Sequence, residues 1–429
     1  MGRTVIHNAT LFTATGKDAF RGDLVVEGDR IASISPTSAQ LREGDIVIDA
    51  TGLFCMPGMT EGHAHLSFEN VTATEDLITP CPETQVFTAA RGAKALIEAG
   101  FTSAYGASEA KLKLAVAVRD EVNAGRLPGP RIRAGGLEIT VTGAMGDESK
   151  AHNPRQGPST IVDGVDEMRR AVRLHCREGI DNIKLDVSGD PFYPATPAHT
   201  TPMTFEEILV AAETAHAYGR KINAHTRSIE GSKRCVRAGV DGLFHTEYAD
   251  EELLDMMEEA RDRIFVVPTV GLFAQIMAGE ASAHGLTPEV GGYMNIPDLL
   301  ENSVKTHSEL RRRGIRHLIG GDYGFGWSKQ GTQGRDLKFF VDHYGYSPAE
   351  ALLCATRNGG LAMGYGGDLG TLEAGSLADL ILVAGDPLAD ISVLSGPEKV
   401  VFVMRAGDVQ KSTLPAASLA VAPALQAAE

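Results

Sequence analysis

Two histidines stand one residue apart in the stretch EGHAHLSF, residues 61–68, directly after the apolar run LFCMPGM. Side chains of a β-strand alternate between its two faces, so His63 and His65 point the same way. Neutral imidazole is a good ligand for a divalent metal such as zinc, whereas unpaired imidazoles beside an apolar core are costly to bury. The pair predicts a metal site at the end of a buried strand. The alternative is a pair of hydrogen-bonded core histidines.

Four further side chains with suitable chemistry occur in or directly after short apolar segments. Lys184 lies in NIKLDV, His225 in KINAHT, His245 in GLFHTE, and Asp322 follows IGG in HLIGGDY. Histidine and aspartate are metal ligands. A buried lysine can lose its proton, and the free amine can then react with carbon dioxide to give a carbamate that bridges two metals. The alternative for Lys184 is an ion pair with a neighbour such as Asp186, which would leave a mononuclear site.

Eight short apolar segments alternate with helical patterns in the central part of the chain. This rhythm over about 300 residues is typical of a (β/α)8 TIM barrel, an α/β fold in which all strand C-termini meet on one face. The six side chains would therefore converge at that face. The expected strands lie at 55–65, 102–108, 131–139, 182–187, 221–226, 242–247, 263–269 and 317–323, and helices are expected at 165–179, 204–219 and 347–364.

The two ends of the chain have a different pattern, in which β-branched residues alternate with polar ones. Residues 1–57 and 366–412 are predicted to pair into a small β-sandwich domain, interrupted by the catalytic barrel at 58–365. Residues 413–429 form an Ala-rich tail, which we expect to be a loose arm or a packing helix.

Several of these segments, taken in order, resemble the amidohydrolase superfamily in its binuclear-metal subgroup. They are MPGMTEGHAH, NIKLDVSGD, INAHT, FHTEY, GGDYG and GTLEAGSLADLILVAGDPLADI. Imidazolonepropionase-like and prolidase-like enzymes and phenylurea, carbamate and arylamide hydrolases are relatives in this group. The resemblance implies two divalent cations, zinc or alternatively cobalt or manganese, with six ligands: His63 and His65 on the more buried ion, His225 and His245 on the more exposed ion, carboxylated Lys184 bridging both, and Asp322 on the buried ion.

The resemblance also implies the reaction, which is hydrolysis of the C–N bond of an amide-type substrate. Divalent cations lower the pKa of a bound water, and Asp322 would pass the proton of that water to the leaving nitrogen. Asp322 and His245 are the expected catalytic residues. The sequence departs from the family pattern at Glu61, where relatives often have Asp, and at Met145, where they often have His.

Candidate substrate contacts lie in the loops after the strands. Tyr323, Phe325 and Trp327 directly follow Asp322, and such aromatics favour an apolar or aromatic substrate. Arg227 could instead hold a substrate carboxylate, as in a peptide or N-acyl amino acid. Met145 and His152 are further candidates. The alternatives are ordinary loop packing for the aromatics, a surface salt bridge for Arg227 and a solvated loop for His152.

Charge and cysteine content limit the classes of binding partner and the cellular compartment that we expect. The formal net charge of −16 argues against nucleic acid or an anionic membrane. The five cysteines are scattered without metal-site spacing, which favours a reducing compartment. We expect a cytoplasmic enzyme acting on a small molecule, and the resemblance implies a homo-oligomer. Alternative functions are a prolidase-like dipeptidase, a deaminase, which commonly lacks the lysine, and a non-catalytic scaffold, which typically loses ligands.

Overall fold

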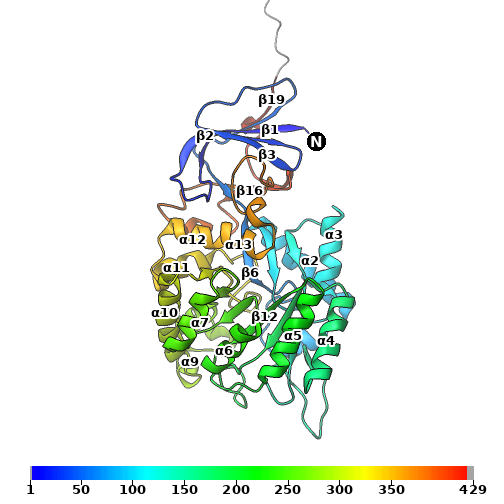
Figure 1. Ribbon diagram of the computed structural model, residues 1–429. Coiled ribbons are helices and arrows are strands. Elements are labelled where there is room, and N and C mark those ends of the chain that lie inside the picture. Colours follow the sequence, from blue (N-terminus) through cyan, green and yellow to red (C-terminus); the bar gives the residue numbers. More distant parts are fainter. Residues whose placement is uncertain (1, 423–429) are drawn as a thin grey trace, which may run out of the picture.

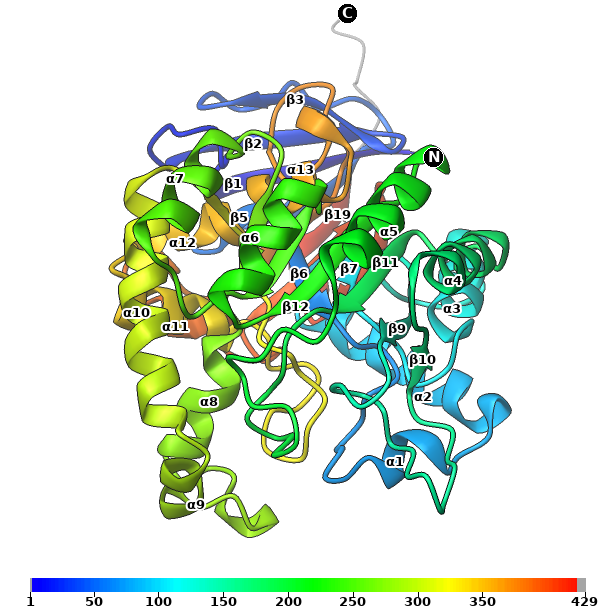
Figure 2. The ribbon, with the colours of Figure 1, turned by 60° about the horizontal axis from the view of Figure 1, so that its bottom comes forward.

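Parallel β-strands surrounded by helices form the larger part of the computed structural model, which describes residues 2–422 (Figures 1 and 2). The strands are hydrogen-bonded in two runs, β6–β7–β8 and β10–β9–β11–β12–β13–β14–β15. The runs join into a barrel because Ser108 and Gly136 form a parallel bridge and the Gly62 N–H donates to the Ile319 carbonyl at 2.9 Å. The barrel strands are β6 (Met59–Ala64), β7 (Phe101–Gly106), β8 (Arg131–Arg133), β9 (Gly135–Thr140), β11 (Asn182–Asp186), β12 (Lys221–Thr226), β13 (Gly242–His245), β14 (Phe265–Val267) and β15 (Arg316–His317).

This arrangement confirms the predicted TIM barrel, and each of the eight expected segments contains barrel strand. Two details differ from the expectation. The segment 131–139 is divided into β8 and β9, with Ala134 between them, and a short extra strand, β10 (Ser159–Ile161), pairs with β9. Three-residue strands such as β10 are too short to be recognised by side-chain alternation.

The helices cover the outside of the barrel. Two of those expected from sequence are present as α4 (Val165–Arg177) and α5 (Phe205–Ala217), and the third is divided into α12 (Pro348–Ala355) and α13 (Arg357–Ala362). Local signals fix their starts, because Thr204 and Ser347 each form a capping box with the glutamate three residues later. The other helices of the barrel are α1 (Glu75–Ile78), α2 (Pro82–Glu98), α3 (Leu114–Asn123), α6 (Ile229–Ala238), α7 (Glu251–Glu259), α8 (Val270–Met277), α9 (Pro288–Tyr293), α10 (Ile296–Arg312) and α11 (Arg335–Tyr344).

The two ends of the chain meet in one β domain above the barrel, where Figure 1 shows the blue N-terminal strands beside the red C-terminal segment. Nine strands form a branched sheet in which β1 pairs with β2 on one edge and with β4 and then β5 on the other. The strands are β1 (Arg3–Leu11), β2 (Phe20–Glu27), β3 (Arg30–Ser35), β4 (Ile46–Asp49), β5 (Phe54–Pro57), β16 (Leu380–Val383), β17 (Val400–Arg405), β18 (Asp408–Ser412) and β19 (Leu419–Val421).

A separate apolar core holds this domain together. It includes Ile6 and Leu24 from the N-terminal segment and Leu382, Phe402 and Met404 from the C-terminal segment. That the branches of the sheet form the two layers of a sandwich stays a prediction. Within the segment expected as an Ala-rich tail, β19 pairs antiparallel with β4, whereas residues 423–429 lie outside the described residues. Among residues 2–422, we find no helix with the length and apolarity needed to span a membrane.

Candidate metal centre

A cavity of about 510 Å³ opens at the C-terminal ends of the barrel strands. Its lining includes all six side chains that the sequence singled out as metal ligands, although they are dispersed from position 63 to position 322. Five of them are almost fully buried, and the side chain of Asp322 keeps 16% of its exposure. The strands deliver them as follows: His63 from β6 and His65 just after it, Lys184 from β11, His225 from β12, His245 from β13, and Asp322 from the loop after β15.

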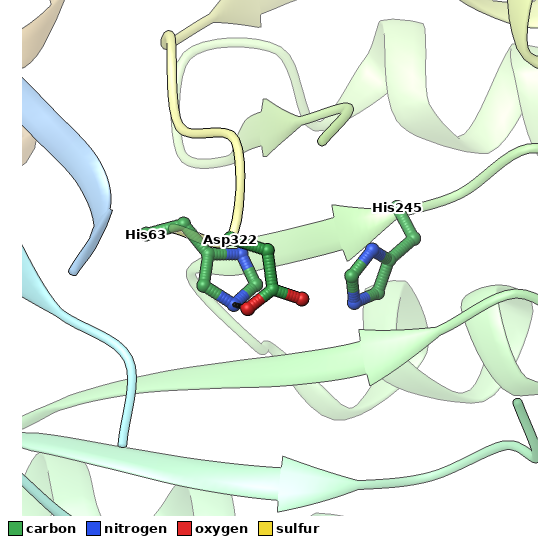
Figure 3. A group of neighbouring side chains, drawn as sticks. All are labelled: His63, His245 and Asp322. Atoms are coloured by element: carbon green, nitrogen blue, oxygen red, sulfur yellow. Dashed lines mark ion pairs between the residues drawn. The ribbon is translucent and has the colours of Figure 1, made fainter. Parts of the chain in front are cut away.

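The imidazole and carboxylate groups are in mutual reach. One donor atom each from His63, His245 and Asp322 lies within 4.8 Å of the others, and Figure 3 shows the three groups turned toward one another. Asp322 Oδ1 is 3.0 Å from His65 Nε2 and 3.9 Å from His63 Nε2. The ring of His225 lies 4.4 Å from that of His245, measured between centroids.

Hydrogen bonds on the outer side of the rings determine which nitrogen of each histidine faces the cavity. His65 Nδ1 contacts the Ser108 carbonyl at 2.8 Å, and His245 Nδ1 contacts Thr269 Oγ1 at 2.5 Å, so Nε2 is left inward in both. His225 has the opposite arrangement, because its Nε2 contacts the Gly189 carbonyl at 3.0 Å. Such partners fix the tautomer and orientation of a metal-binding histidine.

Lys184 is 2% exposed and lies at the floor of the cavity. Its Nζ is 3.7 Å from Glu138 Oε1 and 4.8 Å from the centre of the Phe244 ring. Glu138 also accepts a hydrogen bond from Ser108 Oγ at 3.0 Å. The expected alternative partner, Asp186, has no hydrogen-bond partner at either carboxylate oxygen. The ammonium thus faces one carboxylate at the rim of the histidine cluster.

The backbone at two of these residues is in the left-handed region. His245 has a φ of 73° and Asp322 a φ of 57°. Aspartate tolerates this conformation, but it is uncommon for histidine, and strain of this kind accumulates at functional sites. His245 is the last residue of β13 and Asp322 lies in the loop after β15, and the side chains of both line the cavity.

Burial and charge set the protonation states. Burial lowers the pKa of His63 and of His245 well below the usual value, and burial together with the charge of Arg227 lowers the pKa of His225 to about 4. For Asp322, burial would raise the pKa, but His63, His65 and Lys184 outweigh that effect and lower it. For His65, burial would lower the pKa, but the hydrogen bond and charge of Asp322 outweigh that effect and raise it. Burial thus favours the neutral imidazole at His63, His225 and His245, beside an ionised carboxylate, and metals require this donor state.

The donor set fits a divalent metal ion. Donor atoms of His63, His245 and Asp322 lie within 4.8 Å of one another, and His63 turns Nε2 toward Asp322. Imidazole nitrogen with carboxylate oxygen suits zinc and similar ions.

Of the expected substrate contacts, three line the cavity and three do not. Met145, Phe325 and Trp327 are in its wall, and the rings of Phe325 and Trp327 stack at 5.3 Å. Tyr323 is not among the lining residues: it is buried and its hydroxyl donates to Asp336 Oδ1 at 3.0 Å. His152 is exposed in the loop after β9, away from the lining residues.

Arg227 is also absent from the lining, although it follows β12 directly. The side chain is 1% exposed, its Nε donates to Asp190 Oδ2 at 2.9 Å, and its Nη1 donates to Glu247. The guanidinium carbon lies 4.8 Å from the centre of the Phe273 ring. Two acidic residues distant in sequence enclose the Arg227 side chain. This buried environment differs from both expectations, a substrate anchor and a surface salt bridge.

Sequence reasoning missed several polar residues of the site. Glu138 and Asp190 line the cavity, and Glu109 accepts the backbone N–H groups of Leu66 and Ser67, with burial raising its pKa to about 7. A signal for Glu138 was present, since it lies in the third expected strand segment. The other two lie in loops, where the direction of a side chain cannot be read from periodicity.

Comparison with known proteins agrees with this geometry. Residues 54–409 match the model of the amidohydrolase family. Ochratoxinase from Aspergillus niger is 29% identical over 381 residues, covering 83% of this chain and 75% of that protein. The structure of that ochratoxinase has a TM-score of 0.81 at 26% identity and 96% coverage of both chains. The structure of an Xaa-Pro dipeptidase with bound methionine in its active site has a TM-score of 0.85 at 28% identity, covering 95% of this chain and 99% of that one. The chain belongs to the amidohydrolase family and is a hydrolytic enzyme that acts on C–N bonds.

Proposed function

We propose that this enzyme uses two divalent cations, with zinc as the first choice, to hydrolyse the C–N bond of an amide-type substrate that carries a bulky apolar group. The observation that carries the proposal is the convergence of five buried side chains and Asp322 on one cavity. The ions would supply Lewis acidity and lower the pKa of water. We assign the ligands as follows: His63, His65 and Asp322 hold the more buried ion, His225 and His245 hold the other, and a carboxylated Lys184 lies between them.

Asp322 is the proton carrier in this proposal. Its pKa is held low by His63, His65 and Lys184 despite burial, so it is ionised at neutral pH and can accept the proton of the attacking water. It then returns this proton to the leaving nitrogen, which is a poor leaving group until protonated. His245, held by Thr269 Oγ1, faces the same space, and its proposed catalytic role is to hold the second ion.

The wall of the cavity supports an apolar substrate. Phe68, Phe192, Leu272, Phe325 and Trp327 come from four different segments of the barrel rim, and Phe68 contacts the Phe325 ring edge-on at 6.1 Å. Aromatic side chains of this kind bury large areas of apolar substrate. Aryl amides, phenylureas, carbamates and N-acyl amino acids with a bulky side chain are the candidate classes.

A dipeptidase is the second candidate, supported by the likeness to the Xaa-Pro dipeptidase. A free peptide carboxylate needs a cationic partner, and Lys184 is the sole lysine or arginine among the described residues that line the cavity. We therefore place aryl amides first. Lys184 also argues against the deaminase alternative, because deaminases of the superfamily commonly lack that lysine.

The deciding experiment is a hydrolysis screen of the zinc-loaded protein. The panel contains matched anilides, phenylureas, carbamates, N-acyl phenylalanines and dipeptides, and product analysis distinguishes amine release from ammonia release. We expect amine release that requires metal and is fastest for a neutral aryl substrate. Ammonia as the main product would favour a deaminase, and a metal-loaded protein inert on the whole panel would contradict the proposal.

A further inference from the structure

A second cavity of about 360 Å³ lies on the opposite side of the barrel from the histidine cluster. Four arginines line it, namely Arg119, Arg131, Arg133 and Arg220. Arg131 and Arg133 are the first and third residues of β8, and Arg220 directly precedes β12. Because strand β12 has six residues of about 3.3 Å each, this cavity is separated from the end that holds His225 by roughly 20 Å.

The four arginines face three carboxylates, those of Asp120, Asp181 and Asp379, and Asp120 Oδ1 accepts from Arg119 Nε at 3.0 Å. Asp181 is the one carboxylate among the described lining residues, and it is already shared: Oδ1 accepts from Arg220 at 2.8 Å, while Oδ2 accepts from Arg119 at 2.6 Å and from the Ala134 N–H at 2.9 Å. Arg131 is paired with the buried Asp379, through Nε at 2.9 Å and Nη2 at 3.0 Å.

Arg133 has only neutral acceptors. Its three nitrogens contact Asn182 Oδ1 at 2.9 Å and the carbonyls of Met363 and Asp181 at 3.3 Å. Close by, burial and the charge of Arg131 lower the pKa of the Arg405 guanidinium, and Arg405 Nε is buried without a partner. Positive charge is therefore in excess here, in a chain whose formal net charge is −16.

The cavity lies close to the small β domain, because Arg131 in its wall is bonded to Asp379. Met363 and Tyr365 in its wall directly follow α13, and Asp379 directly precedes β16. A ligand here would touch barrel residues alone, and the β domain would contribute through the contact of Asp379 with Arg131. Guanidinium groups bind phosphate and carboxylate oxygens with two parallel hydrogen bonds, and the excess of positive charge favours an anion.

We propose that this arginine cavity is a binding site for a phosphate-type anion, either inorganic phosphate or the phosphate group of a small metabolite. The volume exceeds that of a bare phosphate and leaves room for a small organic group beside the Tyr365 ring, over which Arg131 lies at 5.7 Å. This site is independent of the proposed reaction.

The test is thermal unfolding and calorimetric titration of the metal-loaded protein with potassium phosphate, against potassium chloride at equal ionic strength. A sugar phosphate forms the second arm and distinguishes a metabolite from the free ion. Arg133→Gln and Arg220→Gln remove one guanidinium each, and Arg169→Gln, in an exposed pair with Asp166 on α4, is the matched control. The side chain of Arg220 is 31% exposed. We therefore expect Arg220→Gln to fold even if Arg133→Gln does not.

We expect a saturable rise in unfolding temperature with phosphate in the wild type and in Arg169→Gln, and at least tenfold weaker binding in both cavity variants. Tighter binding of the sugar phosphate would identify a metabolite as the occupant. An equal response in all four proteins would mean that phosphate binds elsewhere, including the metal centre, and would overturn the proposal. The proposal would also be overturned if 10 mM phosphate gave no response. A change of oligomeric state in Arg220→Gln, with no binding of phosphate to the wild type, would overturn it as well.

Discussion

Replacing Arg227 by methionine tests whether this residue organises the metal centre or binds substrate. Arg227 follows β12 and joins the loops after β11 and β13, because Asp190 and Glu247 both accept from its guanidinium. His225 and His245 lie two residues before Arg227 and Glu247, so loss of this contact frees the two strand ends that carry them. A methionine keeps the contact with Phe273 but leaves two carboxyl groups buried without a cation.

The expected loss in the free energy of unfolding comes from the two carboxyl groups that lose their cation. Burial already raises the pKa of Glu247 to about 7 with Arg227 present, so its protonation in the variant costs little at neutral pH. Asp190 would be left buried without its cation, and this carries most of the cost. We expect a loss of roughly 3–5 kcal/mol, as when one partner of a buried ion pair is removed.

The sign of the pH dependence is a further check. Burial raises the pKa of Glu247, and Arg227 opposes that rise, so the folded pKa of Glu247 lies still further above its unfolded value in the variant. The loss of stability is therefore largest at high pH and shrinks as the pH falls toward the unfolded glutamate pKa near 4.3. Urea unfolding of wild type and variant at several pH values measures this difference. Arg91→Met is the matched control, since Arg91 and Glu69 form an exposed pair for which we expect less than about 1 kcal/mol.

Metal retention and kinetics complete the assay. We expect Arg227→Met to lose metal at lower chelator concentration than the wild type, and to lose kcat/KM to the same extent for a substrate with a free carboxylate and for its methyl ester. A KM increase confined to the carboxylate substrate would show that Arg227 binds substrate. A stability change below 1 kcal/mol that does not depend on pH would refute the electrostatic reasoning.

Four other outcomes are expected. Asp322→Asn retains an oxygen ligand but not the proton carrier, so kcat should fall by about 10³-fold with metal content near normal, and near-normal turnover would exclude the assigned role. Lys184→Ala should bind at most one metal per chain by elemental analysis; two ions per chain would rule out a bridging lysine. Trp327→Ala should reduce kcat/KM about tenfold more for an N-aryl amide than for the N-methyl amide, and equal losses would mean that the indole does not contact the substrate. Burial lowers the pKa of His175 to about 4, so its stabilising effect is complete above pH 6.5 and is lost as the pH falls toward 4; wild type should lose about 3 kcal/mol more than His175→Gln over that range, and identical pH curves would contradict this.

The sequence alone was sufficient for the barrel and for the six residues at its rim. Strand and helix patterns are local, and residues that end parallel strands must meet on one face whatever the detailed packing. His63, Lys184 and Asp322 could therefore be named together although they are distant in the chain. The same kind of pattern predicted that the two ends of the chain pair in one β domain. It did not predict that the sheet of this domain branches at β1.

Only the tertiary structure decided what surrounds those residues. The sequence offered Arg227 as an anchor for a substrate carboxylate, but Asp190 and Glu247 come from other loops and enclose it. The approach of Glu138 to Lys184 and the arginine cavity at the other end of the barrel were likewise decided by the tertiary structure. Which charges become neighbours depends on loop paths and on long-range packing, and burial then sets their strength, because the loss of water makes an unpaired charge costly.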